Sequence, residues 1–322
     1  MEFRTILRVR EMDYRRIDYD SEIMLLGSCF AENIGEKLNY FQFKHVINPF
    51  GILYHPLAIE NFLNRSIHSE YYESGEVFEM DGIWRCFDAH SRLNSTSAED
   101  LLVKLNKTLD KSRTCLQKAT HIIITLGTSW VYYRNEDDKI VANCHKVPHN
   151  QFRKDILNPD RISESVEAMF NTLKNFNPNM EVVFTVSPIR HLRDGMVENT
   201  RSKAHLITGL HTVIEKNPGK IFYHPAYETM MDDLRDYRFY EEDMIHPNAT
   251  AIHYLWKQFY SAWFHPETAQ VMKEVDAVQK GLLHRPFNAN SKNYRQFKSD
   301  LEGKISFLKA RYDHMNFTKT QF

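Results

Sequence analysis

The fold is decided by the stretch Ile23-Met24-Leu25-Leu26-Gly27-Ser28-Cys29-Phe30-Ala31. Its four leading apolar residues are typical of a short buried strand, which the glycine and serine then end. Helical periodicity follows over residues 31–40, so the sequence predicts a strand that leads directly into a helix. Ser28 lies at this junction, where serine ordinarily acts as a helix N-cap.

The same strand-then-helix unit repeats along the chain. Four more apolar runs occur, and they are nearly continuous, as in strands that helices cover on both faces. We therefore predict an α/β fold, a three-layer α/β/α domain that is doubly wound around a mostly parallel five-stranded sheet. The further predicted strands are 45–47, 121–126, 182–186 and 221–223, and the further predicted helices are 98–118, 162–176, 198–216 and 249–264.

Two segments depart from this pattern. Residues 70–93 are typical of a β-hairpin inserted before the third strand. Beyond Pro266, apolar residues at steps of three and four over 293–315 predict one amphipathic helix. We therefore expect a domain over residues 1–265 and a C-terminal helical extension over 266–322. The helix either docks on the domain or forms a homodimer contact.

Composition disfavours several classes of function. Lys and Arg total 41 against 42 for Asp and Glu, so no net field favours nucleic acid as a partner. The first ten residues carry charges where a signal peptide would be apolar, and no apolar run is long enough for a membrane span. The sequence thus predicts a cytoplasmic protein.

Motifs for metals and cofactors are not found in the sequence. The four cysteines have no Cys-x-x-Cys spacing, which disfavours both a zinc site and a disulfide framework. Neither of the Gly-rich phosphate-binding patterns occurs. We therefore expect no metal and no cofactor. Cys29 adjoins Ser28 and is expected to be a packing residue rather than a nucleophile.

The chemistry of an open parallel sheet is expected beyond the carboxyl ends of its strands. Ser28 follows the first strand, and Asp243 and His246 lie together just before the helix that begins near residue 249. A serine hydroxyl becomes nucleophilic when an imidazole takes its proton and a carboxylate orients that imidazole. Together the three residues predict a serine-hydrolase site; separately, a helix cap and a structural turn would explain them.

Two short segments carry a family resemblance. Residues 27–31 read Gly-Ser-Cys-Phe-Ala, and residues 243–247 read Asp-Met-Ile-His-Pro. They resemble the name motif of the GSCFA family and the closing block of the wider SGNH/GDSL hydrolase superfamily. The resemblance implies a flavodoxin-like fold and the hydrolysis or transfer of acyl groups, often acetyl groups on carbohydrate or chains on lipid. Further similar segments are 48–51, 125–132, 143–146 and 186–190.

The resemblance also implies roles for single residues. Ser28 matches the nucleophile, His246 the general base and Asp243 its orienting acid. Gly51 matches the glycine whose backbone N–H binds the oxyanion. Where the superfamily has Gly-x-Asn, this chain has Gly-Thr-Ser ending at Ser129. The Ser129 hydroxyl is therefore expected to replace the asparagine amide as an oxyanion donor.

Three further residues are candidates for binding the substrate. Asn143 and His145 would contact the substrate or its oxyanion, with a hydrogen-bonded polar loop as the alternative. Arg190 follows the fourth strand, where its guanidinium would bind a carboxylate or phosphate. Surface charge is the alternative for Arg190.

The sequence therefore predicts an esterase that acts on a small acyl ester, with acetyl as the candidate group, through an acyl-serine intermediate. The substrate would be a small molecule or a glycan ester. Two alternatives remain open. One is an acyltransferase that uses the same site, and the other is an inactive protein that binds carbohydrate or another ligand.

Overall fold

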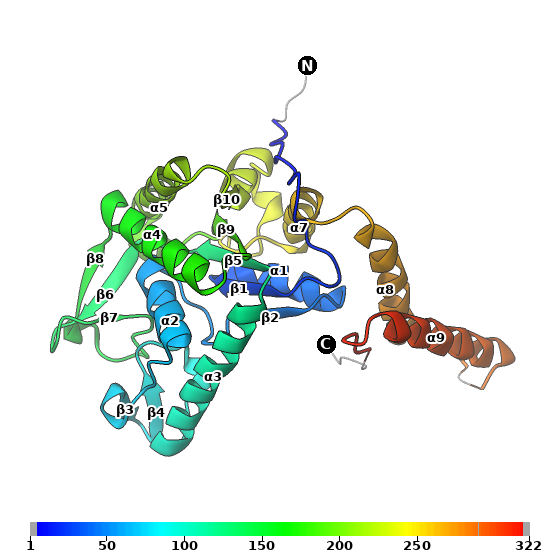
Figure 1. The fold of residues 1–322 in the computed structure, drawn as a ribbon, viewed down its shortest axis with the longest axis horizontal. Helices are drawn as coiled ribbons and strands as arrows, with labels where there is room; N and C mark the ends of the chain where they lie inside the picture. Colours follow the sequence, from blue (N-terminus) through cyan, green and yellow to red (C-terminus); the bar gives the residue numbers. More distant parts are fainter. Residues whose placement is uncertain (1–4, 289, 318–322) are drawn as a thin grey trace.

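A sheet of five parallel strands forms the centre of the protein (Figure 1). The computed structural model describes residues 5–288 and 290–317. The strand order β10-β9-β5-β1-β2 is the flavodoxin-like order, in which the first strand lies inside the sheet. This confirms the predicted fold class. The strands are β1 (Ile23–Gly27), β2 (His45–Ile47), β5 (His121–Leu126), β9 (Glu181–Val186) and β10 (Ile221–His224).

Helices cover both faces of the sheet, because alternate residues of each strand point to opposite sides. Met24 and Leu26 of β1 pack in one apolar cluster, while Ile23 and Leu25 pack in another. The first cluster includes side chains of α2 (Pro56–His68), α3 (Ala98–Lys118), α4 (Pro159–Phe176) and α5 (Met196–Lys216). The second includes side chains of α1 (Cys29–Tyr40) and α7 (Ala249–Trp263). The three-layer architecture is thus confirmed.

Small antiparallel sheets lie outside the central one. The hairpin within residues 70–93 consists of β3 (Val77–Met80) and β4 (Ile83–Cys86). A second, three-stranded sheet was not expected from the sequence, and it follows β5 directly (Figure 1). Its strands are β6 (Trp130–Arg134), β7 (Ile140–Val141) and β8 (Phe152–Ile156). The remaining short elements are α6 (Ala226–Glu228), a π-helix (Thr229–Asp233) and 3₁₀ turns at 74–76, 91–93, 149–151, 192–194 and 237–239.

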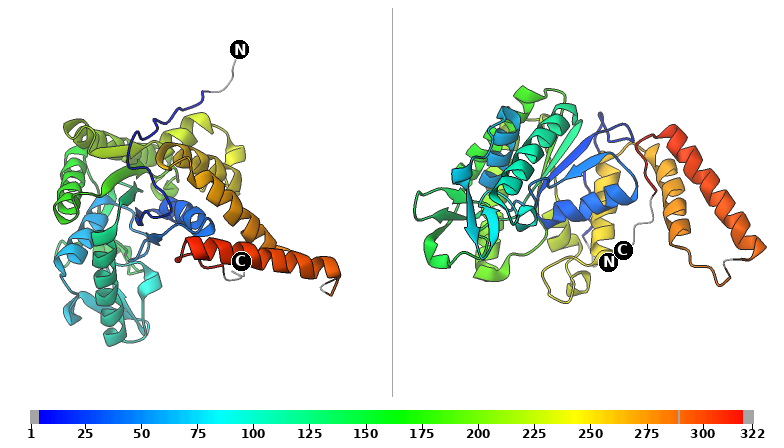
Figure 2. Two further views of the ribbon diagram at one scale, coloured as in Figure 1. Left: turned by 45° about the vertical axis from the view of Figure 1, so that its right-hand side comes forward. Right: turned by 90° about the horizontal axis from the view of Figure 1, so that it is seen from below.

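The C-terminal extension is a helical hairpin that projects from the body of the molecule (Figures 1 and 2). It contains α8 (Thr268–Leu283) as well as α9 (Lys292–Arg311), whereas the sequence predicted the second helix alone. Along α9 only Leu308 is buried, and Phe297 and Phe307 are exposed. Residues 318–322 of the predicted extension lie outside the described residues.

The N-terminal segment is joined to the end of α7. Met12 donates its N–H to the carbonyl of Ala262 at 2.9 Å, and Ile17 donates to the carbonyl of Trp263 at 2.8 Å. His265 in turn donates to the carbonyl of Ile17 at 2.8 Å. Because the side chain of Ile17 is also fully buried, this clasp closes the face of the core under α1 and α7.

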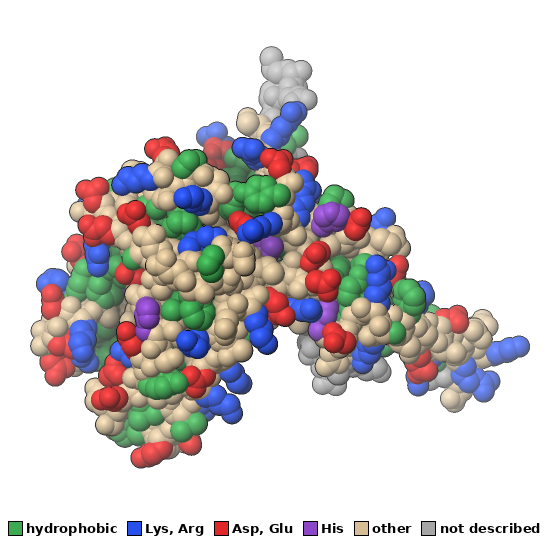
Figure 3. All heavy atoms as spheres, in the orientation of Figure 1, with side chains coloured by type: hydrophobic (Ala, Val, Ile, Leu, Met, Phe, Trp, Pro, Cys, Tyr) green, Lys and Arg blue, Asp and Glu red, His purple; other side chains and the backbone are tan. Residues whose placement is uncertain are grey.

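Charged side chains of both signs occur on the surface. Acidic and basic side chains are interspersed on the face shown in Figure 3, in keeping with the nearly balanced composition. Among residues 5–288 and 290–317, no helix is long and apolar enough to cross a membrane.

Candidate active site

Ser28 is placed by the sharp turn between β1 and α1. Gly27 before it has φ +122°, and a Cβ on Gly27 would lie 2.0 Å from the carbonyl oxygen of Thr125 on β5. Only glycine fits this close approach of two backbones. Ser28 is the N-cap of α1, and its buried hydroxyl accepts the N–H of Phe30 at 3.3 Å. The residue therefore lies at the helix N-terminus, where free N–H groups favour developing negative charge.

Asp243 and His246 form a hydrogen-bonded pair on the loop before α7. Asp243 Oδ2 lies 2.6 Å from Nδ1 of His246, and Asp243 Oδ1 accepts the backbone N–H groups of Ile245 and His246 at 2.8 and 2.9 Å. The backbone N–H of His246, its side chain and the N–H of Ile245 lower the pKa of Asp243 to about 2. The ionised carboxylate fixes the proton on Nδ1, so Nε2 is left with its lone pair for base chemistry.

Arg190 contacts this loop. Its Nη1 donates to the carbonyl of Met244 at 3.3 Å, and its guanidinium lies 4.3 Å from the ring centroid of Tyr240. These contacts hold the loop that carries Asp243 and His246. The structure thus gives Arg190 a bracing position beside the candidate base.

Two contacts lead from the neighbour of Ser28 to His191. The neighbour of Ser28, Cys29, has its Sγ 4.0 Å from the hydroxyl of Tyr54, and the Tyr54 ring lies edge-on to His191 with centroids 5.4 Å apart. Burial, followed by the charges of Lys203 and His246, lowers the pKa of His191 to about 4. Within the described residues no hydrogen bond joins Ser28 to His246.

The expected oxyanion donors have partners in this conformation. Gly51 has φ +75° and donates its N–H to the carbonyl of Asn48 at 2.7 Å. Ser129 is fully buried, and its hydroxyl lies 3.2 Å from the carbonyl oxygen and 3.0 Å from the hydroxyl of Ser202 on α5. The single hydroxyl hydrogen of Ser129 is therefore engaged with α5.

One donor without a partner does lie beside Gly27. The side chain of Asn48 accepts the N–H of Gly27 on Oδ1 at 2.8 Å, and this bond fixes the orientation of the amide. Its Nδ2 is buried and has no hydrogen-bond partner among the residues that the structure describes. An amide N–H left without a partner costs about 1–3 kcal/mol, which an oxyanion next to Ser28 would recover. The sequence analysis did not single out this side chain.

Asn143 and His145 line a cavity of about 510 Å³ together with Tyr54, Thr128 and His191. Asn143 Oδ1 accepts the N–H of His145 at 2.9 Å, and His145 Nε2 lies 2.7 Å from the carbonyl oxygen of Cys86 on β4. Both predicted residues are thus built into the wall of a cavity at the strand ends. His145 is itself anchored to the hairpin.

Lys203 lies under the loops that follow β5 and β9. Its Nζ donates to the carbonyls of Gly127 at 2.6 Å and Ser187 at 2.8 Å, and no carboxylate of residues 5–288 or 290–317 forms an ion pair with it. Burial lowers its pKa to about 7. Lysine in an amphipathic helix usually faces solvent, so no sequence signal distinguishes this one.

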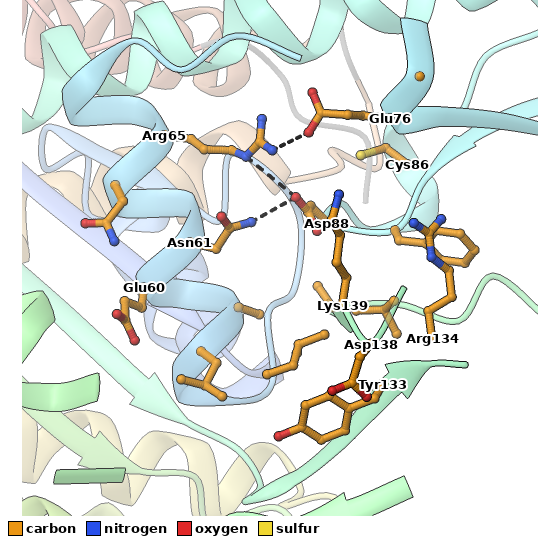
Figure 4. A pocket seen from close by; sticks show the side chains of 18 of the residues that line it. Glu60, Asn61, Arg65, Glu76, Cys86, Asp88, Tyr133, Arg134, Asp138 and Lys139 are labelled. Carbon is orange, nitrogen blue, oxygen red and sulfur yellow. Dashed lines mark hydrogen bonds and ion pairs between the residues drawn. The ribbon is translucent and has the colours of Figure 1, made fainter. Parts of the chain in front are cut away.

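A second cavity, of about 530 Å³, lies between α2, the β3–β4 hairpin and the β6–β7 strands (Figure 4). The positive and negative side chains that line it balance one another. Arg65 pairs with Glu76 and with Asp88, and Asn61 donates to Asp88 at 2.8 Å. None of the residues predicted for the active site lines it. Across the described part of the chain, no group of three or more His, Cys, Asp or Glu side chains is arranged to hold a metal ion.

Taken together, the flavodoxin-like sheet, the serine that follows β1 and the hydrogen-bonded Asp–His pair before α7 define a three-layer α/β protein that carries the residue types of a serine-hydrolase site. The chain belongs to the GSCFA family. The family model matches residues 22–259, and a model described as the GSCFA domain protein, C-terminal domain, matches residues 275–321. No curated protein matches the chain.

Three solved structures are similar at low identity. One is an acetyl esterase variant with acetate ion, which is 13% identical, and another is a carbohydrate esterase family 3 protein from Talaromyces cellulolyticus, which is 11% identical. Each similarity covers 79% of this chain and 99% of the other chain, with a TM-score of 0.35. An acetyl xylan esterase from the rumen bacterium Butyrivibrio proteoclasticus is 13% identical over 83% of this chain and 65% of its own, with a TM-score of 0.34.

Proposed function

We propose that this protein is a serine esterase that cleaves small acyl esters, with acetyl as the candidate group. The observation that carries the proposal is the Asp243–His246 pair at 2.6 Å. This pair leaves Nε2 of His246 with a lone pair for base chemistry, and in the proposal that base acts on Ser28, the N-cap of α1. Membership of the GSCFA family supports the same assignment.

In the proposed reaction, Ser28 Oγ attacks the ester carbonyl while Nε2 of His246 takes its proton. The protonated His246 then gives this proton to the departing alcohol, and an acyl-serine remains. Water, deprotonated by the same imidazole, attacks the acyl-serine and releases the acid. The oxyanion of each step would lie at the N-terminus of α1, with the amide Nδ2 of Asn48 as a further donor.

The test is labelling with a fluorophosphonate, which reacts with activated serines. We expect wild type to be labelled at Ser28 and Ser28→Ala to lose the label. His246→Ala should slow labelling by at least about a hundredfold, since the base is then missing. Cys29→Ala is the matched control, because it changes the adjacent residue, and it should be labelled like wild type. Labelling that persists in Ser28→Ala would refute the assignment.

A second candidate function is ligand binding without catalysis. It is favoured by the burial of Ser28, which is 1% exposed, and by the lack of a Ser28–His246 hydrogen bond in the described structure. A protein of this kind would remain unlabelled by fluorophosphonate while its cavity still bound ligands.

Adding an alcohol to an active sample separates hydrolysis from acyl transfer, because a transferase would form a new ester.

A further inference from the structure

The 510 Å³ cavity lies where the rest of an ester would extend from Ser28. Its wall includes Tyr54, whose hydroxyl contacts Cys29, and Thr128 at the end of β5. It also includes His191, whose ring lies edge-on to that of Tyr54. An ester whose carbonyl lies between Ser28 and His246 would therefore have this cavity within reach of its alcohol part.

Three buried polar atoms of the wall have no hydrogen-bond partner within the described residues. They are Nε1 of Trp130, Nε2 of His191 and Nδ1 of His145. An indole N–H can only donate, so Trp130 is left needing an acceptor. A buried donor without a partner destabilises the free protein, and a ligand that supplies acceptors would relieve this cost.

The charged residues of the wall are predominantly basic. They comprise Lys146, Lys154, Arg193 and Asp194. Lys154 forms an ion pair with Asp194, and its ammonium lies 4.5 Å from the ring centroid of Trp130. Arg193 contacts only the neutral acceptor Nε2 of His149, and Lys146 has no ion-pair partner within the described residues.

The single carboxylate of the wall is therefore neutralised, and two positive charges are left over. The 530 Å³ cavity is different, because its positive and negative side chains balance one another (Figure 4). An excess of cations next to donors without partners favours a ligand that carries negative charge.

We propose that this cavity binds the alcohol part of the ester and selects an alcohol that carries an anionic group, a carboxylate or a phosphate. This inference rests on the proposed esterase function for its place in the reaction. Lys146 and Arg193 would hold the anion, and Trp130 and His191 would donate to its neutral oxygens. The selectivity belongs to the alcohol rather than to the acyl group.

The test compares two esters that differ by one carboxylate, phenyl acetate and 3-acetoxybenzoate, at fixed ionic strength. We expect kcat/KM to be at least about tenfold higher for 3-acetoxybenzoate. The double variant Lys146→Gln/Arg193→Gln should lose this preference and keep its activity on phenyl acetate. Lys111→Gln, which removes an exposed lysine of α3, is the control and should keep the preference. Equal rates on both esters in wild type would overturn the proposal.

A binding measurement separates this inference from the esterase assignment. Calorimetric titration of Ser28→Ala should show that benzoate or phenyl phosphate binds and that benzyl alcohol does not. Adding Lys146→Gln and Arg193→Gln to Ser28→Ala should abolish the binding of the anions. The stronger of the two anions identifies the group. If neither ester is hydrolysed but the anions bind in this way, the esterase function fails and the anion site stands. If no anion binds to Ser28→Ala, the anion site is refuted whatever the activity.

Discussion

At the scale of single residues, Asn48 and Ser129 differ in whether their side chains have a hydrogen-bond donor that is not already engaged. Asn48 has a buried amide N–H without a partner, and Ser129 is engaged with Ser202. We expect Asn48→Asp, which keeps an oxygen for the N–H of Gly27, to lower kcat for phenyl acetate on the order of a hundredfold with KM nearly unchanged. The loss is in kcat because the donor acts on the transition state.

Ser129→Ala is the comparison for that variant. It should keep kcat within about threefold of wild type and lower the free energy of unfolding by about 1 kcal/mol, because a buried hydrogen bond is lost. Urea denaturation measures the second effect. If Ser129→Ala lowered kcat and Asn48→Asp left kcat unchanged, the oxyanion donor would be Ser129, as the sequence predicted.

One pair of predicted site residues could be linked from the sequence because the two lie close together in the chain. Asp243 and His246 are three residues apart, and the structure pairs them. Lys203 and His191 were not assigned to the site, because their surroundings come from loops that follow β5 and β9 and from helix α5. A sequence does not state which lysine of a helix faces carbonyl groups instead of water.

At the scale of elements, helix α2 has a histidine, His55, as its N-cap, and protonation of this histidine opposes folding. His55 Nδ1 accepts the N–H of Ala58 at 3.1 Å, so this ring must be neutral at Nδ1. Burial lowers the pKa of His55 to about 4 and that of His224 to about 3. The unfolded chain takes up these protons near pH 6.5, before the folded protein does.

Stability should therefore fall as the pH drops from about 6.5 towards 4, by up to about 1.4 kcal/mol per pH unit for each of these histidines. Urea unfolding at pH 7, 6 and 5 measures the slope. His55→Asn keeps a capping side chain and should reduce the slope, and His68→Gln, at the exposed end of α2, should not. An unchanged slope in His55→Asn would show that His55 is not the titrating group.

The same elements show what sequence patterns predict well. Strands β2 and β5 and helix α3 begin and end where the sequence predicted, because their apolar runs and turn residues are unambiguous. Helix α2 was missed because it begins at Pro56 with His55 as its N-cap, and histidine is not a typical capping residue. Strand β6 was missed because its Trp, Tyr and Arg residues are half-buried on a small sheet and lack a clear apolar run.

At the scale of the whole molecule, the α8–α9 hairpin is an appendage of the domain. Gly281 of α8 faces Leu301 of α9, and Leu308 and Met315 are buried. Removing residues 292–322 should expose the apolar side of α8 and lower solubility, while fluorophosphonate still labels Ser28, because no residue of the candidate site lies in this segment. Light scattering and labelling of the truncated protein measure both. A change from dimer to monomer with unchanged solubility would instead make the hairpin an oligomer contact.

The clasp between the N-terminal segment and α7 bears on how the protein should be produced in the laboratory. The GSCFA match ends at residue 259, inside α7, and starts at residue 22, after Ile17. A gene trimmed to those limits would encode a domain without Ile17, Trp263 and Phe264, all of which are buried. The apolar face of the core under α1 and α7 would then be exposed to water, and the shortened protein should aggregate when expressed. Expression trials should therefore keep the chain from about residue 5 to beyond His265, where the clasp closes.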